Sequence, residues 1–170
     1  MNKARNIFLG MILLMGIQGL FYYFALPPTM AAHFGISGEA NGWMPKSQFF
    51  IFYAILIAIL GFAFLILIPA LGQLPEVFIR LRQKGERIDL FKKRDILQHI
   101  NNSMLWLGNL TQLLLLVVMQ MVFECNRNGS QRLPKVIVYV LSAYIGGSFL
   151  LMSSRTLKFF QKQNRSSLDA

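Results

Sequence analysis

The sequence is poor in charge and nearly free of cysteine. Only 14% of its 170 residues are charged, against roughly 25% in an ordinary soluble domain. Cys125 is the sole cysteine, so no intramolecular disulfide can form. No nucleophile elbow, P-loop, zinc-protease helix or pair of carboxylates within an apolar run is present. We therefore do not expect an enzyme, and we expect no cofactor.

Long apolar runs dominate what is there. Hydrophobic residues make up 55% of the chain, and the mean hydropathy is +0.49. Four runs contain no charged side chain, at 7–26, 49–71, 104–123 and 136–152. A bilayer core of about 30 Å needs about 20 apolar residues, and in lipid the backbone must bond within itself. The sequence predicts an all-α integral membrane protein, a single domain over 1–170 with four transmembrane helices.

The basic residues indicate the orientation of these spans. Of 17 Lys and Arg residues, 13 lie in the N-terminus, the 72–103 segment and the C-terminal tail, and 4 lie in the two alternate loops. By the positive-inside rule, both termini and 72–103 are cytoplasmic, and 27–48 is extracytoplasmic. Because the basic residues flank spans, the net charge of +10 does not predict nucleic-acid binding. The expected partner of the spans is the lipid bilayer.

The N-terminus resembles a secretory signal, since Lys3 and Arg5 precede the first apolar run. That run exceeds the usual 7 to 15 residues of a cleaved signal. We therefore expect a retained, multi-pass anchor.

The loop at 27–48 is the only long segment before residue 70 that cannot sit in lipid. Two prolines open it, glycines recur through it, and Asn41-Gly42 is a strong turn dipeptide. These residues predict a compact, structured loop made of turns instead of a long helix or strand.

This loop carries the pattern LPxxxxxHFxxxGxxNGWxxK from Leu26 to Lys46. The pattern resembles the bacterial membrane domain of unknown function found in SdpI-type toxin-immunity proteins. The resemblance covers about 40 residues, the first span and the loop. It implies a location in the bacterial cytoplasmic (inner) membrane and a role in immunity or signalling.

The chain departs from that family's pattern at five positions. Met30 replaces an aliphatic residue, Ala31 and Ala40 replace prolines, Asn41 replaces an acidic residue, and Pro45 replaces a small polar one. Asn41 can keep the turn geometry but cannot supply the negative charge. A ligand contact that needs that charge would be lost.

The leading hypothesis is a noncatalytic protein whose outer loop binds a peptide, toxin or envelope component. The candidate ligand-binding residues are His33, Phe34, Glu39, Asn41, Trp43 and Lys46. Trp43 as an interfacial anchor and Lys46 as a snorkelling flank would explain these two residues without a ligand. The alternatives are a small transporter or channel subunit and an accessory subunit of a membrane complex.

Four amides stand within the apolar runs. Gln18 lies in the first span, and Asn109, Gln112 and Gln120 lie on one side of the third. Amides avoid lipid and form hydrogen bonds between helices, so they either hold the bundle together or line a hydrated path. Gln18 lies at a depth similar to the third-span amides, which would allow a contact between them.

The remaining segments carry weaker signals. Within the basic loop 72–103, residues 86–100 predict one short helix that could lie on lipid or bind a cytoplasmic protein. The fourth span has two small-xxx-small spacings, suited to packing or to a homo-oligomer. The polar tail 154–170 is expected to be disordered.

One set of residues at the predicted extracytoplasmic end has the donor types of a metal site. His33, Glu39, Glu124 and Cys125 supply nitrogen, oxygen and sulfur donors, but their spacing is irregular. We expect no metal.

Overall fold

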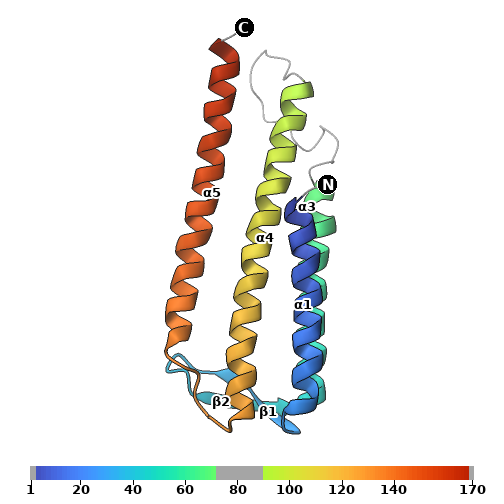
Figure 1. Ribbon diagram of the computed structural model, residues 1–170, viewed down its shortest axis with the longest axis vertical. Coiled ribbons are helices and arrows are strands. Elements are labelled where there is room, and N and C mark those ends of the chain that lie inside the picture. The colour runs from blue at the N-terminus through green and yellow to red at the C-terminus, as the bar shows by residue number, and fades with distance from the viewer. Residues whose placement is uncertain (1–2, 72–89, 169–170) are drawn as a thin grey trace.

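The computed structural model describes residues 3–71 and 90–168. Long helices run side by side, and a two-stranded hairpin lies across one end of them (Figure 1). The elements in chain order are α1 (Lys3–Ala25), β1 (Thr29–Phe34), β2 (Ala40–Pro45), α2 (Lys46–Phe62), the π-helix η1 (Ala63–Leu67), α3 (Ile68–Leu71), α4 (Leu90–Arg127) and α5 (Val136–Leu168).

Four stretches among the described residues are long and apolar enough to cross a membrane: Lys3–Ala25, Lys46–Ala70, Ile96–Arg127 and Val136–Phe159. The prediction of a mostly helical chain with four helices long and apolar enough to span a membrane is confirmed. The N-terminal end of α1 and the C-terminal end of α5 lie at the same end of the bundle, and the hairpin lies at the other (Figure 1). This arrangement is what an even number of crossings requires.

The second span is one continuous helix whose geometry changes just before Pro69. It runs through α2, η1 and α3, with the π-helical turn at Ala63–Leu67. Pro69 has no N–H to bond the carbonyl four residues earlier, and its ring crowds that carbonyl. A wider π turn before the proline accommodates both effects within one span.

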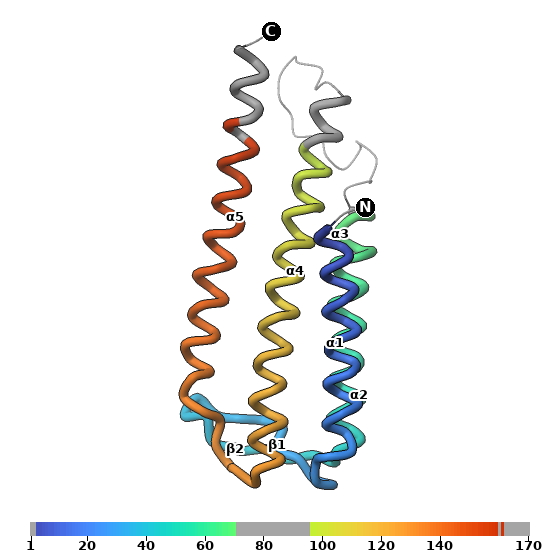
Figure 2. The backbone as a smooth tube through the Cα atoms, in the orientation of Figure 1, coloured from blue at the N-terminus to red at the C-terminus, as the bar shows by residue number. Residues whose placement is uncertain are grey.

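The apolar core lies at the hairpin end of the bundle. Phe123 of α4 is 0% exposed, and the rings of Tyr22, Phe50 and Tyr53 surround it at centroid distances of 4.7, 5.5 and 5.8 Å. α4 lies between α1 and α5 in the bundle (Figure 2). The core therefore joins α1, α2 and α4 next to the hairpin. α5 packs along α4.

The expectation of an all-α protein is wrong in the outer loop. β1 and β2 form an antiparallel pair that extends from Thr29↔Pro45 to Phe34↔Ala40. Asn41-Gly42 is part of β2, and the turn lies earlier, where the N–H of Gly38 donates to the carbonyl of Gly35 at 2.8 Å. Gly38 has φ 81°, the left-handed conformation that closes such a turn and favours glycine.

Two further expectations about helices need correction. The predicted short helix at 86–100 is, from Leu90 onward, the beginning of α4, because no Gly or Pro separates it from the third span. Its first residues, 86–89, lie outside the described part of the chain. In place of a disordered tail, α5 continues as a helix to Leu168, since 154–168 also lacks Gly and Pro.

Candidate functional site

The hairpin is fastened to the end of α4 by one side chain. Asn126 accepts a hydrogen bond from the Ala31 N–H at 2.7 Å and donates to the Ala31 carbonyl at 3.0 Å. Its second amide hydrogen goes to the carbonyl of Val122 at 2.9 Å. The side chain thus occupies the outer edge of β1 as a neighbouring strand would, and Ala31 is buried.

The tip of the hairpin is held by the segment between α4 and α5. The Ala40 N–H donates to the Gln131 carbonyl at 2.7 Å, and the Leu133 N–H donates to the Gly38 carbonyl at 2.8 Å. Arg132 adds an ion pair with Glu39 at 3.9 Å, and its Nε donates to the Ser37 carbonyl at 3.3 Å. The short segment therefore extends the hairpin on the β2 side and fixes its tip.

Two bulges re-aim the side chains next to His33. The register shifts on both sides of the His33↔Gly42 pair, because β1 has the extra residue Ala32 and β2 has the extra residue Asn41. The Asn41 amide oxygen contacts His33 Nδ1 at hydrogen-bonding distance, and Nδ1 donates in this contact when it carries the hydrogen. A side chain at Gly42 would come within 3.0 Å of the His33 Cβ, which explains the glycine.

Three of the six predicted ligand-binding residues share the exposed face of the hairpin. His33, Asn41 and Trp43 are exposed, with Trp43 at 55%. Alternation along β2 turns its neighbours toward the bundle, where Met44 packs against the apolar core. We call His33, Asn41 and Trp43 the hairpin face.

The other three predicted residues lie elsewhere. Phe34 packs against the apolar core. Glu39 sits at the hairpin tip with Arg132. Lys46 turns back toward α1, where its ammonium donates to the Leu26 carbonyl at 3.0 Å and lies 5.0 Å from the centre of the Tyr23 ring. The sequence pattern therefore combined residues of different structural roles.

A second polar cluster joins α1, α2 and α4, with Gln18 partly buried and Gln120 exposed. Gln18 donates to the Gln120 amide oxygen at 2.9 Å and to the Leu116 carbonyl at 3.1 Å. It accepts a bond from the Tyr53 hydroxyl at 3.0 Å. The contact between Gln18 and the third span is therefore present.

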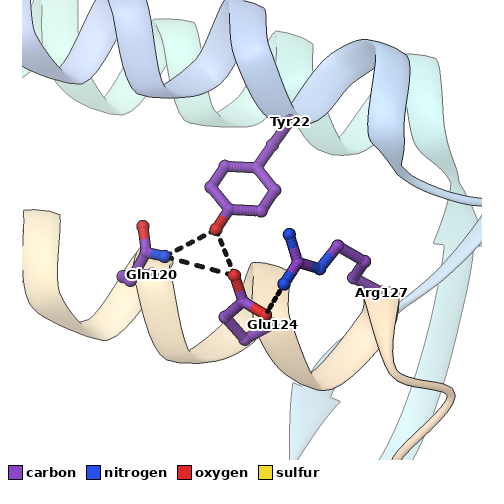
Figure 3. A network of polar contacts seen from close by, with 4 residues as sticks. All are labelled: Tyr22, Gln120, Glu124 and Arg127. Atoms are coloured by element: carbon purple, nitrogen blue, oxygen red, sulfur yellow. Dashed lines mark hydrogen bonds and ion pairs between the residues drawn. The ribbon is translucent and has the colours of Figure 1, made fainter.

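This cluster continues to the end of α4 (Figure 3). Gln120 Nε2 donates to the Tyr22 hydroxyl at 2.5 Å, and that hydroxyl donates to Glu124, whose other oxygen pairs with Arg127 at 2.8 Å. Sequence reasoning missed Tyr22, Tyr53 and Glu124 as members. The available signal was spacing, because Tyr22 follows Gln18 and Glu124 follows Gln120 by one helical turn.

Asn109 and Gln112 do not join this cluster. Asn109 Nδ2 donates to the Ala4 carbonyl at 3.0 Å, near the opposite end of α1. Gln112 lies between the two levels and is 1% exposed. The predicted stripe of amides is therefore divided in the structure.

The four residues of the possible metal set have other partners, and His33 bonds Asn41. Glu124 binds Tyr22 and Arg127, Glu39 pairs with Arg132, and the buried Cys125 thiol donates to the Ser130 carbonyl at 2.9 Å. Within 3–71 and 90–168, no three His, Cys, Asp or Glu residues are grouped so that they could hold a metal ion.

Comparisons with known proteins bear on the first span and the hairpin. Residues 10–57 match the family described as Domain of unknown function (DUF1648), a membrane-associated domain. Searches of curated proteins and of solved structures gave no match. The matched segment begins in α1, includes the whole hairpin and ends in α2, so it contains the hairpin face.

Proposed function

We propose that this is a noncatalytic, multi-pass protein of the bacterial cytoplasmic membrane whose hairpin face recognises an extracytoplasmic peptide, toxin or envelope component. This role is the one implied by the resemblance to SdpI-type toxin-immunity proteins, in immunity or in signalling. The observation that carries the proposal is a hairpin held on its edge and at its tip while His33, Asn41 and Trp43 stay exposed.

Preorganisation supports binding at this face. Asn126, Gln131 and Leu133 fix the hairpin backbone, so a ligand would not have to order it. The Asn41 contact orients the His33 ring and leaves its second ring nitrogen, Nε2, to bond a ligand. Trp43 adds a large ring with an N–H donor, a residue type common in binding hot spots.

The charge around the face indicates the kind of ligand. Neither the Asn41 amide nor the Trp43 ring carries a charge, and Glu39 at the tip is paired with Arg132. A ligand would therefore gain from apolar contact and neutral hydrogen bonds more than from a long-range field. A peptide segment with an apolar side chain and backbone donors fits this chemistry.

Site-specific photocrosslinking in native membranes tests the proposal. We expect p-benzoylphenylalanine at Trp43 to form a discrete adduct with an extracytoplasmic peptide or protein, and His33→Ala to reduce the yield at least threefold with unchanged abundance. The matched control is the same probe at Phe149, an aromatic side chain of α5 that is 72% exposed. An adduct shared by both positions, no adduct at Trp43, or a yield insensitive to His33→Ala would contradict recognition by the hairpin face.

A further inference from the structure

Gln112 is the most unusual polar residue of the bundle. It is 1% exposed and among the largest fully buried side chains, yet neither its Oε1 nor its Nε2 has a hydrogen-bonding partner within the described residues. Asn109, one turn earlier on α4, is 5% exposed, and its Oδ1 also lacks a partner there. Two acceptors and one amide nitrogen are thus buried without a hydrogen-bonding partner in the part of the chain that the structure describes.

Within 3–71 and 90–168, Asn109 and Gln112 are the buried side chains with unpartnered nitrogen or oxygen atoms. Asn126, buried at the outer end of the same helix, bonds Ala31 with its oxygen and nitrogen and bonds Val122 with its second hydrogen. Gln18 and Gln120 are also bonded. Because buried polar groups in native proteins are nearly always satisfied, unpartnered atoms at Gln112 and Asn109 point to a ligand.

The local geometry limits the size of that ligand. Residues three apart on a helix have Cβ atoms about 5–6 Å apart, so the two amide oxygens can face one small molecule. Gly108, one turn from Gln112, is covered by Phe8 and Phe64, because a side chain there would meet both rings at 2.8 Å. One turn beyond Gln112, the Leu116 carbonyl is bonded by Gln18. Along α4, Gln112 therefore lies between an aromatic layer at Gly108 and the Gln18 cluster at Leu116.

The three unpartnered atoms, two amide oxygens and one amide nitrogen, indicate the kind of ligand that would bind. A metal cation such as Ca²⁺ needs six to eight oxygen ligands, and two amide oxygens fall well short. An anion would need several donors, whereas the unpartnered atoms include a single amide nitrogen. Water both donates to oxygens and accepts from N–H, and buried waters typically make about three such bonds.

We propose that Asn109 and Gln112 form an internal hydration site at mid-bundle that holds water. One water molecule donates its two hydrogens to Asn109 Oδ1 and Gln112 Oε1. A second accepts a hydrogen bond from Gln112 Nε2. The α1–α4 contact is then hydrated at a depth where the surrounding helix surfaces are apolar.

Water-edited solid-state NMR of the isotopically labelled protein in lipid bilayers tests this site. We expect polarisation from water to reach the Gln112 side-chain nitrogen at least twice as fast as it reaches the fully bonded Asn126 nitrogen. Asn126 is a demanding control because it lies at the end of the bundle. Assignment comes from the signal lost in Gln112→Met.

Two outcomes of that measurement would overturn the proposal. One is transfer to Gln112 no faster than to Asn126, which describes a dry site. The other is a Gln112 signal that shifts when sodium or potassium replaces choline in the buffer, which describes a bound cation in place of water.

Thermal unfolding of Gln112→Leu gives a second test. The unfolding midpoint is expected to change in opposite directions for a hydrated site and for a dry site. With water bound, leucine displaces it and leaves Asn109 Oδ1 unsatisfied, so the unfolding midpoint should fall by several degrees. With a dry site, leucine removes two unsatisfied polar groups, and the midpoint should rise. A rise in the unfolding midpoint therefore overturns the proposal. If the variant does not fold, the NMR measurement on the unchanged protein decides the question.

Discussion

A single amide side chain determines how the hairpin meets the helices. Asn126 makes three hydrogen bonds, two of them to one residue of β1, and all its hydrogen-bonding hydrogens are used. The amide places an acceptor beside a nitrogen with two hydrogens, which are the two that the Ala31 and Val122 carbonyls accept. The identity of residue 126 therefore matters more than its size or polarity.

The isosteric change Asn126→Asp isolates that requirement. The carboxylate can still accept from the Ala31 N–H, but its second oxygen faces the carbonyls of Ala31 and Val122 with no hydrogen to donate. We expect a loss of about 3 kcal/mol in unfolding free energy, because two buried acceptors lose their donor and a charge is buried. Chemical unfolding in detergent measures it.

Asn128→Asp is the matched control for this change. Asn128 is exposed and two residues away, so the same substitution there should alter stability by no more than about 0.5 kcal/mol. Equal effects at the two positions would show that the added negative charge acts in general, and would remove Asn126 from the fastening role.

At this scale the sequence predicted some partners and missed others. The possibility of a contact from Gln18 to the third span followed from polarity and depth alone, and the structure contains it. The role of Asn126 could not be predicted from the sequence, because its partner Ala31 lies 95 residues away and the bonded groups of Ala31 belong to the backbone. A side chain that bonds distant backbone leaves no pattern in the sequence around it.

At the scale of elements, the length of the apolar runs predicted the helices. The strands could not be predicted, because the glycines and prolines of this segment are typical of turns. The four spans follow from hydropathy, since any long apolar segment in lipid must be helical. The hairpin contains Pro, Gly and Ala at positions where strands usually carry branched residues. Its strands form because Asn126 and the segment before α5 supply bonds that the local sequence cannot.

The Tyr22 hydroxyl contributes two hydrogen bonds to the contact between α1 and α4. Tyr22→Phe removes a bond to Glu124 and one from Gln120 without changing the ring that stacks on Phe123. We expect a loss of about 1–2 kcal/mol, typical of two hydrogen bonds inside a membrane protein. The readout is the free energy of unfolding in detergent.

Tyr139→Phe provides the comparison, because Tyr139 is 74% exposed on α5 and should tolerate the loss of its hydroxyl. A double-mutant cycle of Tyr22→Phe with Glu124→Gln then isolates their coupling, expected at about 1 kcal/mol. A coupling of zero would mean that the two groups contribute independently, and the network in Figure 3 would not act as a unit.

For the whole molecule, the distribution of charge and the arrangement of the helices agree. The two ends of the bundle differ, since one carries both chain termini and the other carries the hairpin (Figure 1). Of the 17 basic residues, 13 belong to segments on the terminal side of the predicted spans. We therefore expect the hairpin end to face away from the cytoplasm.

Thiol labelling in intact cells tests this orientation. Ser37→Cys, exposed at the hairpin tip, should react with a membrane-impermeant maleimide, whereas Gln161→Cys, exposed on the far part of α5, should react only after permeabilisation. The native Cys125 is buried and serves as the unlabelled background. The reverse pattern of labelling would invert the topology and place the hairpin face in the cytoplasm.

The hold on the hairpin tip also sets an order of events during synthesis. The Ser37 carbonyl accepts a hydrogen bond from Arg132, which is translated 95 residues later. At about 5–20 residues per second, the ribosome adds Arg132 roughly 5 to 20 s after it has made the hairpin. Until the segment before α5 has emerged, the hairpin tip lacks the hydrogen bonds that hold it. A chain that stops inside α4 would consequently carry every residue of the hairpin face and still present it on an unfastened hairpin.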